Sequence, residues 1–206
     1  MNKTSICGTA IALCALVGCE NEATRREPIS IVLQPEKGEA VTLQIPRGYV
    51  EEPKDPQGVL SHVILRSPAK DYSGSNVFAP ESEVRMLIEP VSGAADAAQD
   101  RQAAALRRPR GSEDAIVKAA EQPKEGSIAY SFRNGKENAE AYFVKSATGD
   151  VFAECWKGVC KAFKTWKKRV HLRFDYQPVV ASDVQAVDAS IDRMLQSFAA
   201  EGDASK

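Results

Sequence analysis

The stretch Ser182–Phe198, SDVQAVDASIDRMLQSF, decides the fold. Its large apolar residues recur at the spacing of one helix face, and Ser182 with Gln185 has the pattern of a capping box. The apolar stripe consists of Val184, Val187, Ile191, Met194, Leu195 and Phe198, and the charged residues off the stripe are Asp183, Asp188, Asp192 and Arg193. An amphipathic helix of this kind must cover an apolar surface, so the stretch predicts a helix packed on one face of a sheet.

The sheet is predicted from the alternating segments that precede the helix. Residues 170–176 alternate cleanly, with Val170, Leu172, Phe174 and Tyr176 on the apolar face and His171, Arg173 and Asp175 on the wet face. Further strands are predicted over residues 29–33, 41–45, 59–66, 83–89, 128–132, 139–145, 151–155 and 160–166. Several of them are joined by short turns such as Asn134-Gly135, which favours antiparallel pairing. The fold class is therefore α+β, with a mostly antiparallel sheet.

A helical insertion interrupts this series of strands. Residues 92–110 are rich in alanine, the residue with the best helix propensity, and Leu106 is their only large aliphatic residue. We expect a surface helix that buries little area. A second short helix is predicted to begin at Ser112 and to present Ile116, Val117 and Ala120 on one face.

The N-terminus has the features of a bacterial lipoprotein signal. Lys3 gives a positive start, residues 6–17 are apolar or small, and Leu16-Val17-Gly18-Cys19 resembles a lipobox. The apolar run is shorter than the roughly 20 residues that span a bilayer. The resemblance implies removal of residues 1–18 and acylation of Cys19; an ordinary cleaved signal with an incidental Cys19 is the alternative.

These boundaries divide the rest of the chain. Residues 19–28 form a polar tether, residues 29–200 a single α+β domain and residues 201–206 a frayed tail. No later segment is long and apolar enough to cross a bilayer, so the lipid would be the anchor. Because Glu20 rather than Asp follows Cys19, enteric-type sorting rules place the protein at the outer membrane, facing the periplasm.

The mature chain is nearly neutral. Removing residues 1–18 takes away Lys3 and no acidic residue, which leaves 26 basic and 28 acidic residues and a net charge of −2. A chain with this balance has no general attraction to nucleic acid.

Two cysteines remain outside the signal and Cys19. Cys155 and Cys160 are separated by four residues, a spacing that suits a bridge across the tip of a hairpin. In an oxidising compartment we expect them to form a disulfide.

The hairpin segment is also basic and aromatic. No acidic residue occurs between Glu154 and Asp175, and the candidate partner-binding residues are Trp156, Lys157, Lys161, Lys164, Trp166, Lys167, Lys168 and Arg169. One interpretation is a surface for an acidic partner protein, with the two tryptophans as anchors. The alternative is a solvated edge hairpin whose lysines oppose edge-to-edge pairing.

Motifs for catalysis are missing from the sequence. It contains no G-x-S-x-G elbow, no H-E-x-x-H helix and no Gly-rich phosphate loop, and its only histidines are His62 and His171. We therefore expect a non-enzymatic protein without a metal or cofactor.

Two family resemblances bear on the function. The segment Ile45-Pro46-Arg47-Gly48-Tyr49 and the final helix ending in Ser197-Phe198 resemble a PsbP-type domain, and the insertion and the disulfide hairpin depart from it. In signal, size, cysteine pair and lack of catalytic motifs, the chain resembles immunity lipoproteins that neutralise toxins delivered into the periplasm. That resemblance implies a toxin effector as partner. The alternative is an envelope-maintenance lipoprotein that binds lipid or cell-wall fragments between sheet and helix.

Overall fold

The computed structural model describes residues 25–53, 58–72, 74–106, 116–120, 127–134 and 137–199. The predicted signal, Cys19 and the first part of the predicted tether lie outside these residues, as do the predicted tail from residue 200 onward and residues 107–115. No helix in the described ranges is long and apolar enough to cross a membrane.

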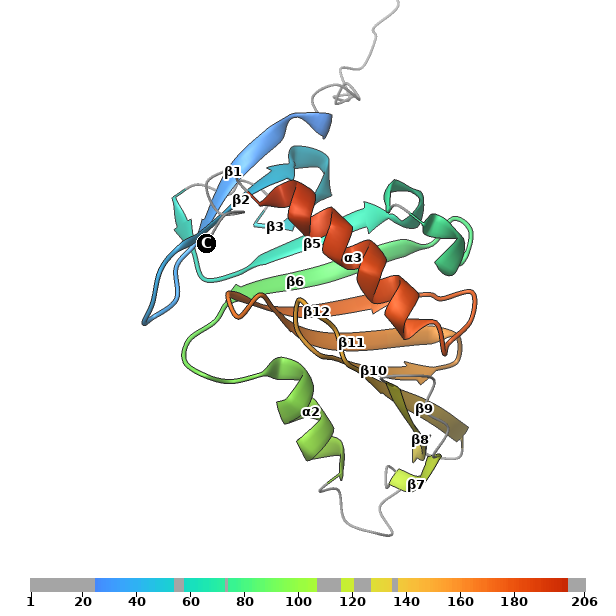
Figure 1. Ribbon diagram of the computed structural model, residues 1–206. Helices are drawn as coiled ribbons and strands as arrows, with labels where there is room; N and C mark the ends of the chain where they lie inside the picture. The colour runs from blue at the N-terminus through green and yellow to red at the C-terminus, as the bar shows by residue number, and fades with distance from the viewer. Residues whose placement is uncertain are drawn as a thin grey trace, which may run out of the picture.

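The described strands form one large sheet and one small sheet (Figure 1). The large sheet has nine described strands, all paired antiparallel with their neighbours. Their order is β3 (Val50–Glu52), β5 (Val63–Pro68), β6 (Glu83–Pro90), β12 (Val170–Tyr176), β11 (Val159–Trp166), β10 (Val151–Trp156), β9 (Glu137–Val144), β8 (Ser127–Asn134) and β7 (Ile116–Ala120). The small sheet has the order β2 (Val41–Pro46), β1 (Pro28–Leu33) and β4 (Val59–Leu60), with β1 and β4 parallel.

The C-terminal helix α3 (Val184–Phe198) packs on one face of the sheet, which confirms the predicted α+β architecture. Figure 1 shows α3 lying obliquely across the large sheet, with its C-terminal end beside the small sheet. Five of the six residues of the predicted stripe are buried, and Met194 is half-buried. On β12 the predicted apolar face is buried as well. Burial of these side chains against α3 forms the main core and holds the two layers together.

The second helix, α2 (Ala97–Leu106), covers the opposite face of β10 and β11. It begins where Asp96 accepts hydrogen bonds from the backbone N–H of Ala98 and Gln99, each at 3.0 Å. As expected it buries little, because Ala98 and Ala105 face the sheet and Leu106 is 53% exposed. A smaller core lies beneath it, built mainly from aromatic and alanine side chains of β8, β9 and β10.

Several local expectations were wrong. Ile116–Ala120 is strand β7, because its backbone pairs with β8 and this non-local pairing prevails over the weak helical pattern. The predicted strand over residues 59–66 is divided into β4 and β5, which belong to different sheets. The capping box is also wrong, since Asp183 is the N-cap of α3 and its side chain makes no capping hydrogen bond.

The described end of the tether rests on the domain. The backbone N–H of Arg47 donates to Glu27 O at 2.9 Å, and Arg25 packs so closely over Gly48 that a Cβ there would lie 2.9 Å from the Arg25 Cβ. Residues 25–28, which the sequence assigned to the tether, therefore rest against the domain.

Candidate functional site

The predicted basic–aromatic segment is divided among three environments. β11 pairs with β10 on one side and β12 on the other, so it is a central strand and the edge-hairpin interpretation was wrong. Its eight residues extend over about 25 Å, which separates the turn before it from the turn after it. Its successive side chains point to opposite faces, one covered by α3 and the other partly covered by α2. The segment cannot form one continuous surface.

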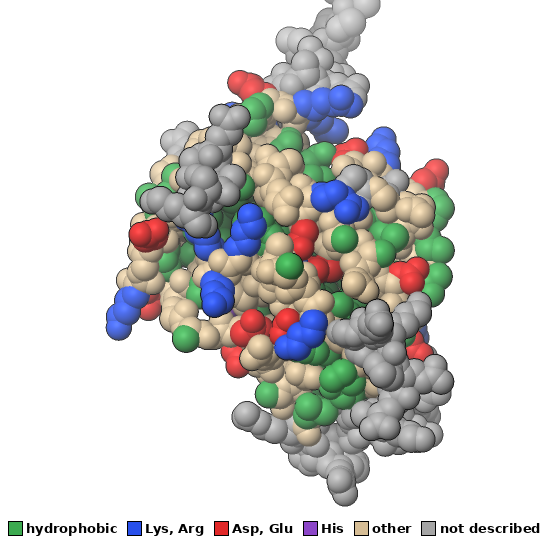
Figure 2. All heavy atoms as spheres, viewed as in Figure 1, with side chains coloured by type: hydrophobic (Ala, Val, Ile, Leu, Met, Phe, Trp, Pro, Cys, Tyr) green, Lys and Arg blue, Asp and Glu red, His purple; other side chains and the backbone are tan. Residues whose placement is uncertain are grey.

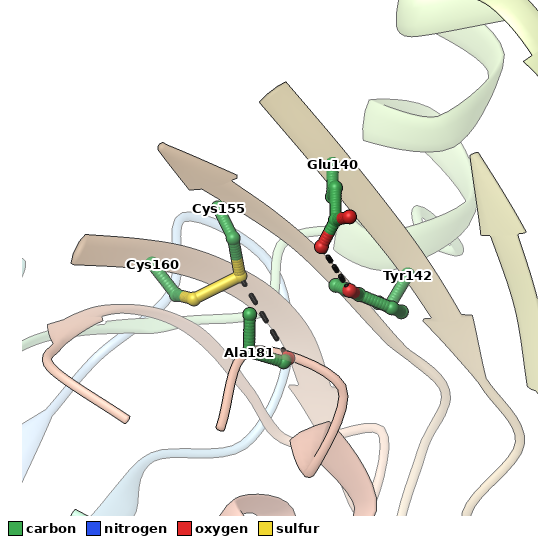
Figure 3. The surroundings of a disulfide bond; sticks show 5 residues. All are labelled: Glu140, Tyr142, Cys155, Cys160 and Ala181. Carbon is green, nitrogen blue, oxygen red and sulfur yellow. Dashed lines mark hydrogen bonds between the residues drawn. A yellow bond between two sulfur atoms is a disulfide. The ribbon is translucent and has the colours of Figure 1, made fainter. Parts of the chain in front are cut away.

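The first environment is the hairpin tip, where the predicted disulfide is present. Cys155 and Cys160 face each other across β10 and β11, and their sulfur atoms are bonded (Figure 3). Lys157 and Gly158 form the two-residue turn with φ of 51° and 76°, as a type I′ hairpin requires. Both cysteines are buried, and Figure 3 shows the Cys155 sulfur directed toward the carbonyl oxygen of Ala181, 4.0 Å away. The tip is thus fixed by the turn and by the disulfide.

Beyond the disulfide the tip exposes apolar side chains. Trp156 and Val159 are cross-strand partners and are 42% and 44% exposed. The Lys157 ammonium lies 4.9 Å from the centre of the Trp156 ring, a cation–π distance. An exposed tryptophan on a rigid hairpin has the properties of a binding anchor.

A second exposed apolar pair lies at the same end of the sheet. The segment after β12 carries Val179 and Val180, which are 57% and 48% exposed, and then passes the disulfide at Ala181. These two valines and the hairpin pair are four of the seven large hydrophobic residues recorded as exposed in the described ranges. We call Trp156, Lys157 and Val159 the tip surface, since strand alternation points Trp156 to the face opposite Cys155, while Val179 and Val180 precede Ala181 on the Cys155 side.

A hollow of about 480 Å³ adjoins the tip surface at Val159. Its charged lining comes from Arg66, Glu81, Glu83, Arg85 and Asp175. Both arginines are already held by Glu51, each at 2.7 Å. This pairing, with the Arg85 hydrogen bond as its largest contribution, lowers the pKa of the Glu51 carboxyl. The hollow therefore has mixed charge and does not select one sign of ligand.

The second environment is the interior between β11 and α3, and it corrects the expectation for Lys164. The Lys164 side chain has no exposed area, so it cannot contact a partner. Its Nζ donates to Oδ1 of Asp188 and to Oδ1 of Asp192, both at 2.7 Å, and to Oγ1 of Thr148, also at 2.7 Å. We call these four residues the Lys164 cluster. Lys164 shares its face of β11 with Ala162, and this small residue leaves room for the lysine chain beneath α3.

The turn between β9 and β10 completes the cluster. Gly149 has φ of 133°, and a Cβ there would lie 2.0 Å from Thr165 O, so only glycine fits. The Lys167 N–H donates to Thr148 O at 2.6 Å, and the Thr148 hydroxyl donates to Oδ2 of Asp192. Thr148 is therefore held between β11 and α3.

Burial sets the electrostatics of the cluster. The side chains of Asp188 and Asp192 are 4% and 12% exposed. Desolvation raises the pKa of the Asp188 carboxyl, and the charge of Lys164 opposes that rise. One ammonium between two carboxylates leaves one excess negative charge, which a buried site disfavours.

Trp166 also lies in the covered interior, which corrects its assignment as a surface anchor. It is 3% exposed and belongs to the main core. Lys167 lies over its ring at 4.7 Å. A buried tryptophan of this kind contributes to packing and is not accessible to a partner.

The third environment is the turn after β11. Lys167 and Lys168 are exposed there with φ of 48° and 57°, and Arg169 is half-buried. This turn lies at the opposite end of β11 from the tip surface. Figure 2 shows basic and acidic side chains interspersed on the face that carries α3, with no uniformly basic area in view. Electrostatic attraction by a broad basic patch is therefore not a property of this face.

The described residues offer no obvious catalytic centre. Among them, no three His, Cys, Asp or Glu side chains group closely enough to hold a metal ion. Thr148 contacts the amine of Lys164, as a nucleophile with a lysine base would, but its hydroxyl accepts a hydrogen bond from that amine and donates its own proton to Asp192, so the amine is not placed as its base. No family model, curated protein or solved structure matches the chain.

Sequence reasoning missed the three partners of Lys164. Strand alternation gave a usable signal, because Lys164 has the same parity as Cys160, Ala162 and Trp166, which are all buried. On α3, Asp188 and Asp192 are four residues apart and flank Ile191, so they border the buried stripe.

Proposed function

We propose that this protein is a lipoprotein, acylated at Cys19 and facing the periplasm from the outer membrane, that acts by binding a protein partner. The observation that carries the proposal is the exposed Trp156–Val159 pair on a hairpin fixed by a disulfide. Exposed apolar side chains gathered at one end of a domain are typical of an interaction surface. A rigid tip also loses little conformational entropy when it binds.

A toxin effector is the partner class that we favour. The support is the resemblance in signal, size and cysteine pair to immunity lipoproteins, together with an exposed apolar pair at a hairpin tip that a partner could contact. On this proposal Trp156 and Val159 insert into the effector, and Lys157 and Lys161 contact acidic residues around them. A lipid-binding groove between sheet and α3 is less favoured, because buried side chains occupy that space.

Binding is tested with the toxin encoded by a neighbouring gene. We expect Trp156→Ala to weaken its affinity at least tenfold, since a hot-spot tryptophan contributes about 2 kcal/mol or more. Leu106→Ala removes an exposed apolar side chain on α2, 53% exposed against 42% for Trp156, and serves as the matched control. Equal affinity of the Trp156→Ala and Leu106→Ala variants would argue against the tip surface.

Anchoring is tested separately. Cells fed with a labelled fatty acid should incorporate it into the wild-type protein and not into the Cys19→Ser variant. A toxin-sensitive phenotype on deletion of the gene would connect the anchor to protection. Recovery of unmodified protein from the cytosol would contradict the compartment.

A further inference from the structure

The Lys164 cluster holds a primary amine in contact with two carboxyl groups, away from the tip surface. The Lys164 Nζ lies 2.7 Å from Oδ1 of Asp188, so the carboxyl carbon is at most about 4 Å away, one C–O bond further on. The lysine and Asp188 come from different elements, β11 and α3, and both are buried. Reacting groups held at near-attack distance behave as if present at very high concentration.

The charge balance of the cluster favours a protonated carboxyl. With Lys164 charged and both aspartates ionised, the buried group carries one excess negative charge. Uptake of one proton neutralises the cluster without breaking a contact. The proton is best placed on Asp188, which is the less exposed of the two carboxyls. Each carboxyl accepts two side-chain hydrogen bonds, Asp188 from Lys164 and Ser146 and Asp192 from Lys164 and Thr148, so their difference in exposure is what distinguishes them.

This arrangement assigns a different chemical role to each group. The Asp192 carboxylate can take a proton from the Lys164 ammonium, which frees the amine lone pair. The acid form of Asp188 is the better electrophile, since its hydroxyl can leave as water. A desolvated lysine is also a better nucleophile than one in solvent.

We propose that Lys164 and Asp188 become joined by an intramolecular amide bond between Nζ and the side-chain carboxyl carbon, with Asp192 as the proton-transfer group. The Nζ attacks the carbon, a C–N bond forms and the C–OH bond breaks. Asp192 passes the proton that it first received to the departing hydroxyl, which leaves as one water. It then takes the second proton from the nitrogen, so the amide keeps one N–H, Asp192 ends protonated, and no oxidant or reductant is needed. The product links the centre of the sheet to the helix that covers it.

The experiment uses the full chain, purified from the envelope, reduced and denatured, and then digested with trypsin. Trypsin does not cut after an acylated lysine, so the peptide containing Lys164 should appear joined to the peptide that contains Asp188 and Asp192. The joined species should be lighter than the sum of its parts by one water. Fragmentation between the two aspartates shows which one carries the bond.

The variants separate the bond from the fold. Lys164→Arg keeps the charge and cannot form the amide, and Asp192→Asn removes the proton acceptor while keeping its shape; both should lose the joined peptide. Lys161→Arg, on the exposed face of the same strand, should keep it. Wild-type protein that yields only separate peptides of unaltered mass would overturn the proposal, and so would a bond located at Asp192. Neither result depends on the toxin-binding proposal.

Discussion

Two parts of the β10–β11 hairpin differ in environment more than their composition indicates. At the tip, Trp156 and Lys157 are exposed. Further along, Lys164 lies under α3, and Trp166 is buried on the same face of β11. The residue types are the same in the two places. What differs is the face of the sheet and the element that covers it. In this sequence, a lysine or tryptophan indicates a function only once two things are known: the face of the sheet to which it points, and the element that packs on that face.

The largest expected effect concerns the two lysines of β11. Lys164→Ala should lower the free energy of unfolding by about 3–5 kcal/mol, because it leaves the buried polar groups of Asp188, Asp192 and Thr148 without their partner. Lys161→Ala should change it by less than about 0.5 kcal/mol, since Lys161 is exposed and only 3.9 Å from Asp175 at its nearest. Urea unfolding of both variants gives the comparison. Similar losses of stability in the Lys164→Ala and Lys161→Ala variants would mean that packing beneath α3 does not distinguish the two lysines.

Replacing the two tryptophans should change the free energy of unfolding by nearly as different amounts. Trp166→Ala removes a core side chain and should cost about 3–5 kcal/mol of stability. Trp156→Ala should cost less than about 0.5 kcal/mol and act on partner affinity instead. Thermal unfolding measured beside toxin affinity separates the two roles. A destabilised Trp156→Ala variant would show that the tip belongs to the core after all.

The disulfide should have an intermediate effect on stability. Replacing Cys155 and Cys160 by alanine opens a short loop and should cost about 2 kcal/mol. The Lys164 cluster does not touch the bridge, so its contacts should survive, whereas the tip surface loses its support. Unfolding of the variant is compared with that of reduced wild-type protein. If only the double variant or only the reduced wild-type protein lost stability, the loss could not be explained by removal of the cross-link alone.

A smaller effect on stability is expected at alkaline pH, where a buried tyrosine ionises. Burial raises the pKa of Tyr72, whose side chain lies in the main core, to about 12 from an ordinary value of 10.0. A raised pKa contributes stability below pH 10.0 that is lost as pH rises through about 12, because the unfolded chain ionises first. The loss should be about 1 kcal/mol near pH 11. Urea unfolding across this range measures it, with Tyr72→Phe as the variant that should lose less; an equal slope in both would contradict the assignment.

The elements of the fold were largely readable from local pattern. The stripe on Ser182–Phe198 and the alternation on residues 170–176 depend on nearest neighbours, and the structure confirms both. Strand order was not readable, because β12 pairs with β6, some 80 residues earlier, and no local pattern encodes such a partner. Without that order β11 could be taken for an edge, and the weak segment at residues 116–120 could be taken for a helix.

The candidate site was readable only in part. The disulfide followed from the spacing of Cys155 and Cys160 and from a hairpin that is local in sequence. The burial of Lys164 depended on where α3 lies, and its partners come from α3 and from the turn at Thr148. The exposed valines at residues 179–180 carry no motif and became visible only as neighbours of the tip.

The seating of Arg25 on Gly48 limits how far the domain can stand from a bilayer. Six backbone steps separate Arg25 from Cys19, so an acylated Cys19 would keep the domain within about 20 Å of the lipid headgroups. If Cys19 is acylated as proposed, the protein could not reach far from the membrane. A partner would then have to come close to the membrane surface before the protein could bind it.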